Sequence, residues 1–174
     1  MKDTLIISAF PASGKTYATK YFSEKGVTVL DSDSSKFSWI INEKGEKVRN
    51  PNFVEDYMKH ISENIGKVDC IFVSSHKEVR EALKKLTDEF LVVYPDKCLK
   101  DEWIERCFLR GNSPEFCQKI ADHWDEWIDD IEDDFDLCGL RLKATCPNIV
   151  SLLNLLDFLK IRRSDQEIYE KEKI

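Results

Sequence analysis

The segment "LIISAFPASGKTYATKYF", Leu5 to Phe22, constrains the fold of this chain more than any other stretch. An apolar, β-rich run ends at Ala9, a helical pattern starts after Gly14, and "SGKT" lies between them. That ending is typical of the pattern G-x-x-x-x-G-K-[ST], in which backbone N–H groups surround a phosphate at a helix N-terminus. The lysine of the pattern reaches phosphate oxygens, and the last hydroxyl binds Mg²⁺. The segment therefore predicts a strand, a phosphate-binding loop and a helix.

The loop departs from the pattern at its first position, where Ala9 replaces glycine. That glycine serves the sharp exit from the strand, whereas Gly14 brings the backbone close to phosphate. Alanine is acceptable at the exit if its φ stays negative, and Pro11 has no N–H to offer. We therefore expect the phosphate contacts to come from the residues that follow, which are Ala12, Ser13, Gly14, Lys15 and Thr16.

Short apolar runs alternate along the chain with segments of helical period, which is the pattern of parallel βα units. The predicted strands are Leu5–Ala9, Val27–Leu30, Cys70–Ser74, Phe90–Tyr94 and, more weakly, Leu140–Ala144. The predicted helices are Lys15–Glu24, Asn52–Gly66, Lys77–Leu86, Lys100–Leu109, Pro114–Asp133 and Pro147–Lys160. The polar stretch 42–52 is predicted to be a loop. Most of the acidic run from Asp125 to Asp136 is predicted to form the solvent-facing side of the fifth helix.

Composition excludes several classes of protein. The 174 residues suit one domain, 1–174. The net charge of −7 disfavours tight, sequence-independent binding to duplex nucleic acid. The six cysteines lack zinc-ligand spacing and are expected to be reduced thiols. Neither a signal peptide nor an apolar run of membrane-spanning length is visible, so we expect a cytoplasmic protein with no membrane partner, or one in a host cytoplasm if the chain is viral.

The stretch "AFPASGKT" resembles the Walker A motif of small P-loop kinases, a group that includes nucleoside monophosphate kinases, polynucleotide 5′-kinases and zeta-toxin-like kinases. The resemblance implies an α/β, three-layer fold with a five-stranded parallel sheet flanked by helices. It also implies a short helical lid, here around residues 96–115, and ATP and Mg²⁺ as cofactors. The charged tail 162–174 is expected to fray. A kinase this compact and divergent would suit a phage as readily as a cell.

Two carboxylates follow the second strand in "VTVLDSDSSKF". Asp31 and Asp33 stand at the carboxyl end of a parallel strand, which is the edge where ligands bind in such sheets. The resemblance implies that Asp33 is the base for a hydroxyl acceptor and that Lys36 is a basic substrate contact, with Asp31 beside them. The alternative is a polar turn that caps the next helix.

The third strand ends in Ser74, Ser75 and His76, where many P-loop proteins carry an acid that supports Mg²⁺. Two arrangements stay open: Asp31 or Asp33 supplies the carboxylate near the metal, or Thr16, phosphates and water hold Mg²⁺. Ser75 and His76 are candidate acceptor contacts, although capping of the following helix explains the serines equally well.

Arg106 and Arg110 lie four residues apart, on one face of a predicted helix that ends at Gly111. The resemblance implies that such arginines close over ATP from a lid and stabilise the transferring phosphoryl group. The alternative is that they pair with acids on the same helix, which are Asp101, Glu102 and Glu105. After the fifth strand, Thr145 and Asn148 are candidate contacts to adenine.

The sequence therefore favours an ATP- and Mg²⁺-dependent kinase, and the size and acidity favour a nucleoside monophosphate or related nucleotide as acceptor. Two alternatives remain. One is a kinase of a hydroxyl group on a polynucleotide 5′ end, a modified base in DNA or a small metabolite. The other is a degenerate protein that binds ATP without turnover, which the losses at Ala9 and after the third strand motivate.

Overall fold

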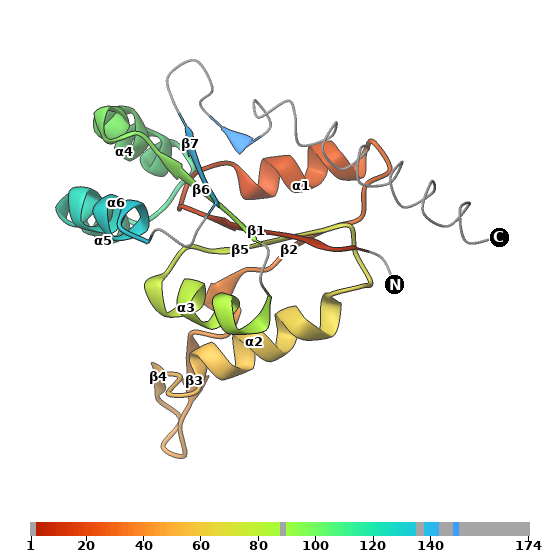
Figure 1. Ribbon diagram of the computed structural model, residues 1–174. Coiled ribbons are helices and arrows are strands. Elements are labelled where there is room, and N and C mark those ends of the chain that lie inside the picture. The colour runs from red at the N-terminus through yellow and green to blue at the C-terminus, as the bar shows by residue number, and fades with distance from the viewer. Residues whose placement is uncertain (1–2, 88–89, 135–137, 143–147, 150–174) are drawn as a thin grey trace.

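A parallel sheet forms the centre of the protein in the computed structural model, which describes residues 3–87, 90–134, 138–142 and 148–149 (Figure 1). The strands are β1 Leu5–Ala9, β2 Val29–Asp31, β5 Cys70–Ser74, β6 Leu91–Pro95 and β7 Cys138–Leu142. Their order is β2-β5-β1-β6-β7, and every neighbouring pair is parallel. All carboxyl ends therefore meet at one edge.

Helices cover both faces of the sheet, as an all-parallel sheet requires. In Figure 1, α1 (Lys15–Ser23) lies on one face, and α2 (Phe53–Asn64) and α3 (Lys77–Leu86) lie on the other. The central strands are accordingly apolar and buried, with β1 buried at every position. The predicted α/β fold with a parallel sheet is confirmed.

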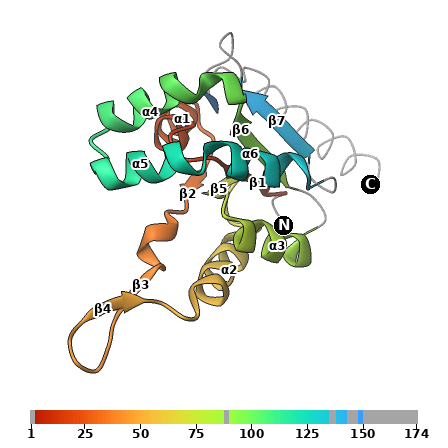
Figure 2. The same ribbon diagram turned by 90° about the vertical axis from the view of Figure 1, so that its left-hand side faces the viewer.

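Three further helices stand beyond the carboxyl ends of the strands (Figures 1 and 2). A short turn, η2 (Lys97–Leu99), leads into α4 (Lys100–Leu109), and α5 (Pro114–Asp122) and α6 (Trp124–Glu132) follow. The predicted bounds of α3 and α4 are confirmed. The single helix predicted over Pro114–Asp133 is wrong, because the backbone of His123, at φ −105 and ψ 14, separates α5 from α6.

The bend at His123 keeps apolar side chains of both helices in the core. Ile120, Trp124, Ile128 and Ile131 are buried on either side of it, whereas Phe116, near the start of α5, is 40% exposed. At the bend between α5 and α6, the His123 ring stacks on the ring of Trp127, with the ring centres 5.3 Å apart.

The stretch predicted as a loop, 42–52, instead holds one strand of a hairpin. Strand β4 (Lys47–Arg49) pairs antiparallel with β3 (Trp39–Ile41). The side chain of Asn42 accepts hydrogen bonds from the backbone N–H groups of Lys44 and Glu46 and closes the turn. Figure 2 shows the hairpin reaching away from the parallel sheet, beside α2.

The acidic run does more than coat a solvent face. Asp130 of α6 forms ion pairs with Lys77 and Arg80, and Asp134 forms ion pairs with Arg80 and Lys84. The Arg80 side chain is 2% exposed, so its partners compensate a buried charge. These contacts fasten α3 to α6.

Some predicted features lie outside the described residues: Thr145, the helix over Pro147–Lys160 apart from its second and third residues, and the tail 162–174. In the part of the chain that the structure describes, Cys70, Cys98, Cys107 and Cys117 are free thiols. No helix there is long and apolar enough to cross a membrane.

Truncation of Ile128 tests the packing of α6. Ile128 is fully buried, so Ile128→Ala removes three carbons from the core and is expected to lower the free energy of unfolding by about 2–5 kcal/mol. Urea unfolding followed by circular dichroism measures the change. Phe116→Ala, at a half-exposed position of α5, is the matched control and should cost about 1 kcal/mol or less. Equal losses in the two variants would contradict the assigned burial.

Candidate functional site

The loop between β1 and α1 leaves the sheet through two left-handed residues. Ala12 has φ 61 and Gly14 has φ 93. A Cβ on Gly14 would meet the Cβ of Asn148 at 3.5 Å, an ordinary contact, so the backbone conformation is what favours glycine there. Asn148 therefore lies against the loop. Its predicted contact with adenine stays a prediction.

Three hydrogen bonds hold the loop in place, one from within the loop and two from distant parts of the chain. Ser13 Oγ donates to the carbonyl oxygen of Phe10 at 2.7 Å. The indole N–H of Trp103, on α4, donates to the carbonyl oxygen of Pro11 at 2.7 Å. The backbone N–H of Ile149 donates to the carbonyl oxygen of Ser13 at 3.1 Å. The loop is thus preorganised by the helix predicted as a lid.

Lys15 lies over the same loop. Its Nζ donates to the carbonyl oxygens of Ala9 at 2.9 Å and Phe10 at 3.3 Å. Burial lowers the pKa of Lys15 from 10.5 to about 8; Asp31 and Asp33 oppose that shift, and Arg110 adds to it. The lysine is therefore a poorly solvated cation, which a phosphate group would stabilise.

Thr16 and Asp31 join the first turn of α1 to the end of β2. Thr16 Oγ1 donates to Asp31 Oδ2 at 2.8 Å. A hydroxyl and a carboxylate side by side are oxygen donors of the kind that Mg²⁺ takes, together with phosphates and water. The donor set therefore fits Mg²⁺ and places Asp31, rather than Asp33, beside the predicted metal ligand Thr16.

Asp33 caps a short 3₁₀ turn, η1 (Ser34–Lys36). Its carboxylate accepts from the backbone N–H of Ser35 at 2.9 Å and from Ser35 Oγ at 2.8 Å. The capping role that the sequence left open is therefore real. Asp33 also lines the same cleft as Lys15 and Thr16, so the cap fixes the carboxylate beside the phosphate loop.

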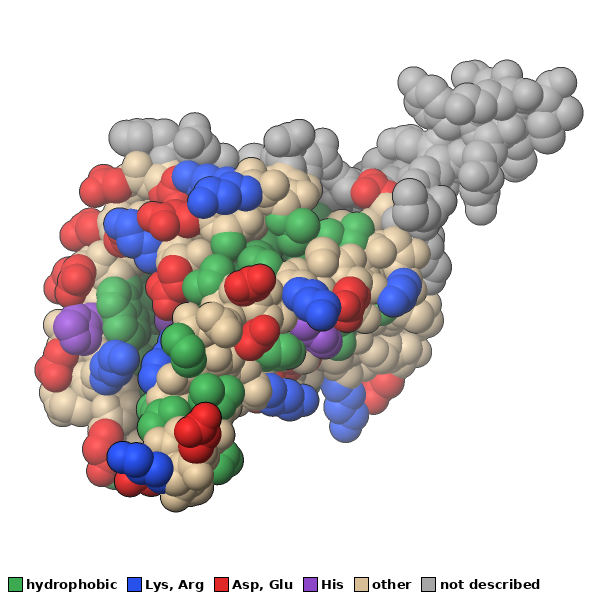
Figure 3. All heavy atoms as spheres, turned by 90° about the horizontal axis from the view of Figure 1, so that it is seen from below, with side chains coloured by type: hydrophobic (Ala, Val, Ile, Leu, Met, Phe, Trp, Pro, Cys, Tyr) green, Lys and Arg blue, Asp and Glu red, His purple; other side chains and the backbone are tan. Residues whose placement is uncertain are grey.

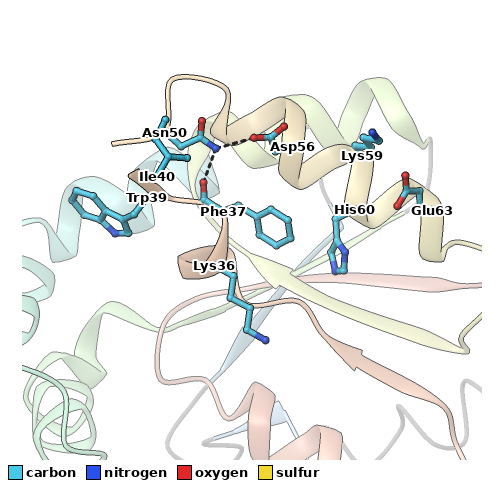
Figure 4. A pocket seen from close by; sticks show the side chains of 9 residues that line it. All are labelled: Lys36, Phe37, Trp39, Ile40, Asn50, Asp56, Lys59, His60 and Glu63. Atoms are coloured by element: carbon cyan, nitrogen blue, oxygen red, sulfur yellow. Dashed lines mark hydrogen bonds between the residues drawn. The ribbon is translucent and has the colours of Figure 1, made fainter. Parts of the chain in front are cut away.

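Lys36 does not reach this cleft. It lines a second pocket of about 400 Å³ between η1, β3 and α2, as Figure 4 shows. Asp33, Ser34 and Ser35 line the first cleft, whereas Lys36 lines the second pocket. The predicted role of Lys36 as a basic substrate contact stays a prediction. The residues that line the second pocket are Lys36, Phe37, Trp39, Ile40, Asn50, Asp56, Lys59, His60 and Glu63.

The cleft itself has a volume of about 570 Å³ and runs along the carboxyl ends of β1, β2 and β5. It brings together most of the predicted residues: Ala12, Lys15, Thr16, Asp31, Asp33, Ser75, His76 and Arg110. Sequence reasoning did not single out several other lining residues, among them Arg80, Asn112, Phe116, Trp127 and Asp130. They come from α3, α5, α6 and the turn before α5, whose packing no local pattern reveals.

A buried tyrosine fixes the floor between β2 and β5. The hydroxyl of Tyr57 donates to the carbonyl oxygen of Ser32 at 2.6 Å and accepts from the backbone N–H of Ser74 at 3.2 Å. Burial raises the pKa of Tyr57, so the hydroxyl keeps its proton at neutral pH. Next to it, His76 Nδ1 lies 3.1 Å from Ser74 Oγ, and burial lowers the pKa of His76.

The two arginines predicted for the lid lie in different surroundings. Arg110 lines the cleft and makes no ion pair or side-chain hydrogen bond in the described part of the chain. Arg106 forms an ion pair with Glu102 on its own helix and stacks on Trp103 at 4.5 Å. Arg106 is absent from the cleft lining, so the alternative of pairing within the helix holds for Arg106 alone.

Comparison with known proteins identifies the fold. No protein-family model and no curated protein matches the sequence. A tunicamycin resistance protein from Deinococcus radiodurans is similar in structure, with a TM-score of 0.60 and 11% identity over 91% of this chain and 96% of its own. Shikimate kinase from Bacteroides thetaiotaomicron has a TM-score of 0.57 and 13% identity over 91% and 98%. A gluconokinase from Sinorhizobium meliloti 1021 has a TM-score of 0.53 and 12% identity over 97% of both chains. The predicted resemblance to small P-loop kinases is thereby confirmed at the level of the fold.

The lowered pKa of Lys15 predicts a pH dependence of stability. Between pH 8 and 10.5 the unfolded lysine keeps its proton while the folded lysine loses it, so unfolding takes up a proton and stability rises with pH. Below pH 8 both states are charged and the cost of burying the charge is fully present. Relative to Lys15→Met, the free energy of unfolding of the wild type should rise by up to about 3 kcal/mol between pH 7.5 and pH 10.5. Urea unfolding of both proteins measures this, and a constant difference across the window would contradict it.

Proposed function

We propose that the chain is an ATP- and Mg²⁺-dependent kinase that transfers phosphate to a hydroxyl group of a small molecule. One observation carries the proposal: Lys15, Thr16 with its partner Asp31, the carboxylate of Asp33 and the arginine Arg110 line a single cleft. These are the groups that phosphoryl transfer needs, because the reaction depends on positioning and on neutralising charge.

The donor side of the cleft is the phosphate loop. The N-terminus of α1 follows Gly14 and favours the phosphates of ATP, and Lys15 exchanges its two loop carbonyls for phosphate oxygens. Mg²⁺, held by Thr16 and supported by Asp31, would neutralise phosphate charge when bound. Arg110 approaches from the turn between α4 and α5, where an unpaired guanidinium can stabilise charge on the transferring group.

The acceptor side of the cleft supports a hydroxyl group as acceptor. The sequence alone favours a different acceptor, the phosphate of a nucleoside monophosphate. A phosphate that reacts as acceptor needs available cations at the reacting position, but Lys77 and Arg80, which line the cleft there, are already paired with Asp130. The wall instead offers the carboxylate of Asp33 and the serines Ser74 and Ser75. A carboxylate suits a hydroxyl acceptor because the attacking oxygen must give up its proton.

In the proposed reaction the acceptor oxygen bonds to the γ-phosphorus of ATP, and the bond from that phosphorus to the β–γ bridging oxygen breaks to leave ADP. Asp33 orients the acceptor hydroxyl and accepts its proton. Its hydrogen bonds from Ser35 hold the carboxylate in one orientation for this step. Phe10, Phe116 and Trp127 line the same cleft and reduce access of water, which would otherwise compete as acceptor.

The surface supports a small acceptor over a long polyanion. On the face that α2, α3 and the hairpin present in Figure 3, acidic and basic side chains alternate and form no continuous basic surface. The net charge of −7 agrees with this.

A transfer assay tests the proposal. The protein is incubated with Mg²⁺, γ-labelled ATP and separate pools of small hydroxy compounds, nucleosides, nucleoside monophosphates and 5′-hydroxyl oligonucleotides. Label is expected in a small hydroxy compound or nucleoside, and Lys15→Met should abolish it. Transfer only to nucleoside monophosphates would restore the nucleotide-kinase hypothesis. ATP binding without transfer to any pool would identify a degenerate ATP-binding protein.

The substitution Asp33→Asn distinguishes a kinase that acts on a hydroxyl group from one that acts on a phosphate group. Asparagine keeps an oxygen that can cap η1 but has no basic carboxylate, so transfer to a hydroxyl should fall by about 10²–10⁴ in kcat. Stability in urea should change little, whereas Asp33→Ala should also lose the cap, at about 1 kcal/mol. A kcat for Asp33→Asn within a factor of three of wild type would contradict the assignment of Asp33 as base.

A further inference from the structure

An arginine of the hairpin lies between two aromatic rings. The guanidinium carbon of Arg49 is 4.7 Å from the ring centre of Phe53 and 6.0 Å from the ring centre of Trp39. Trp39 is 49% exposed, whereas Phe53 is buried. Two rings restrict the side chain while leaving its edge open, because a guanidinium stacks through its plane and donates hydrogen bonds from its rim.

Arg49 has no acidic partner among the residues that the structure describes. Within the described residues it makes no ion pair and no side-chain hydrogen bond. Among the five arginines of the described residues, Arg80, Arg106 and Arg141 contact carboxylates, and Arg49 and Arg110 do not. Arg49 is thus one of two arginines left open to an anion, in a chain with 33 Asp and Glu residues against 26 Lys and Arg residues.

The arginine adjoins the cleft. The Phe53 ring that supports it meets the ring of His76 edge-on at 6.2 Å, and His76 lines the cleft. Arg49 also acts electrostatically on His76, because its charge adds to the effect of burial in lowering the pKa of that imidazole. His76 is thus neutral at pH 7 and does not supply a cation of its own beside Arg49.

We propose that Arg49, stacked between Phe53 and Trp39, forms an anion subsite at the acceptor end of the cleft, which binds a carboxylate or phosphate group carried by the acceptor. The inference rests on the proposed function, since it describes the same acceptor. The guanidinium fork matches the two oxygens of either group, and the rings reduce the entropy lost on binding. The hydroxyl at Asp33 and the anion at Arg49 then fix two points of one substrate.

An acceptor comparison tests the subsite. Label from γ-labelled ATP is followed into three pools: small hydroxy acids, sugar phosphates, and uncharged polyols with nucleosides. Transfer is expected into a charged pool, and which one receives label distinguishes a carboxylate from a phosphate. Transfer into the uncharged pool at equal kcat/KM would overturn the subsite and leave the kinase proposal standing. Transfer into none of the pools would count against the kinase proposal itself.

Variants of Arg49 give the matching change in kinetics. Arg49→Gln should raise KM for the charged acceptor by about 10- to 100-fold, because a charge-assisted pair is lost, while KM for ATP stays within twofold. Arg49→Lys should recover part of the loss. The control is Lys47→Gln, which removes a neighbouring cation that also lies over Trp39 but does not contact Phe53. Its KM should stay within twofold, and equal effects of the two substitutions would overturn the assignment to Arg49.

A binding measurement needs no turnover. Tryptophan fluorescence is titrated with inorganic phosphate and, separately, with acetate, in wild type, Arg49→Gln and Trp39→Phe. An anion at Arg49 lies next to Trp39, so a saturable change is expected in wild type for at least one of the two anions. Phosphate at the Lys15 loop can change the signal of Trp103 and Trp127 in all three proteins, so the readout is the part of the change that wild type shows beyond the two variants. Identical titrations of wild type and Arg49→Gln with both anions would overturn the subsite.

Discussion

The cleft depends on the backbone turn by which the chain leaves β1. Ala12 and Gly14 both have a left-handed backbone conformation. This conformation costs roughly 1 kcal/mol of conformational free energy at alanine and little at glycine. Hydrogen bonds from Ser13, Trp103 and Ile149 stabilise the strained segment. Only with this turn do the end of β1 and the start of α1 come close enough for Lys15 to reach the loop carbonyls and Thr16 to reach Asp31.

The same turn couples the donor side of the cleft to the helices beyond the sheet. Trp103 belongs to α4 and is fully buried, yet its indole N–H bonds the loop at Pro11. The ring of Phe10 packs edge-on against Trp124 of α6 at 5.7 Å. The phosphate loop is therefore one wall of the core shared by α4 and α6. A displacement of either helix changes the loop as well as the position of Arg110.

The sequence predicts those parts of the site that depend on residues close together along the chain. The loop and the paired acids after β2 follow from motif and strand end, whereas helix spacing predicts Arg106 and Arg110 alike and only the folded structure separates them. Reasoning from sequence located the conformational difficulty at Ala9, whereas Ala9 is an ordinary strand residue and the left-handed alanine is Ala12. It also grouped Lys36 with Asp33, whereas Lys36 lines the second pocket and Asp33 lines the cleft. The hairpin and the α3–α6 ion pairs depend on contacts between distant segments, which no single-sequence pattern contains.

Charge pairing explains how a chain of net charge −7 can still hold phosphate. Carboxylates neutralise six of the cations described above, which therefore add little attraction for a ligand: Lys77, Arg80, Lys84, Lys97, Arg106 and Arg141. Lys15 is different because it is buried against loop carbonyls, and burial makes its charged form costly. A phosphate that replaces those carbonyls relieves that cost, and so gains more from Lys15 than from an exposed lysine. Arg110 lines the same cleft as Asp31 and Asp33, and within the described residues neither Arg110 nor Arg49 has a carboxylate partner. Cations without a carboxylate partner are the ones available to the oxygens of a ligand, so these two arginines and Lys15 can attract anions that the net charge of the chain would repel.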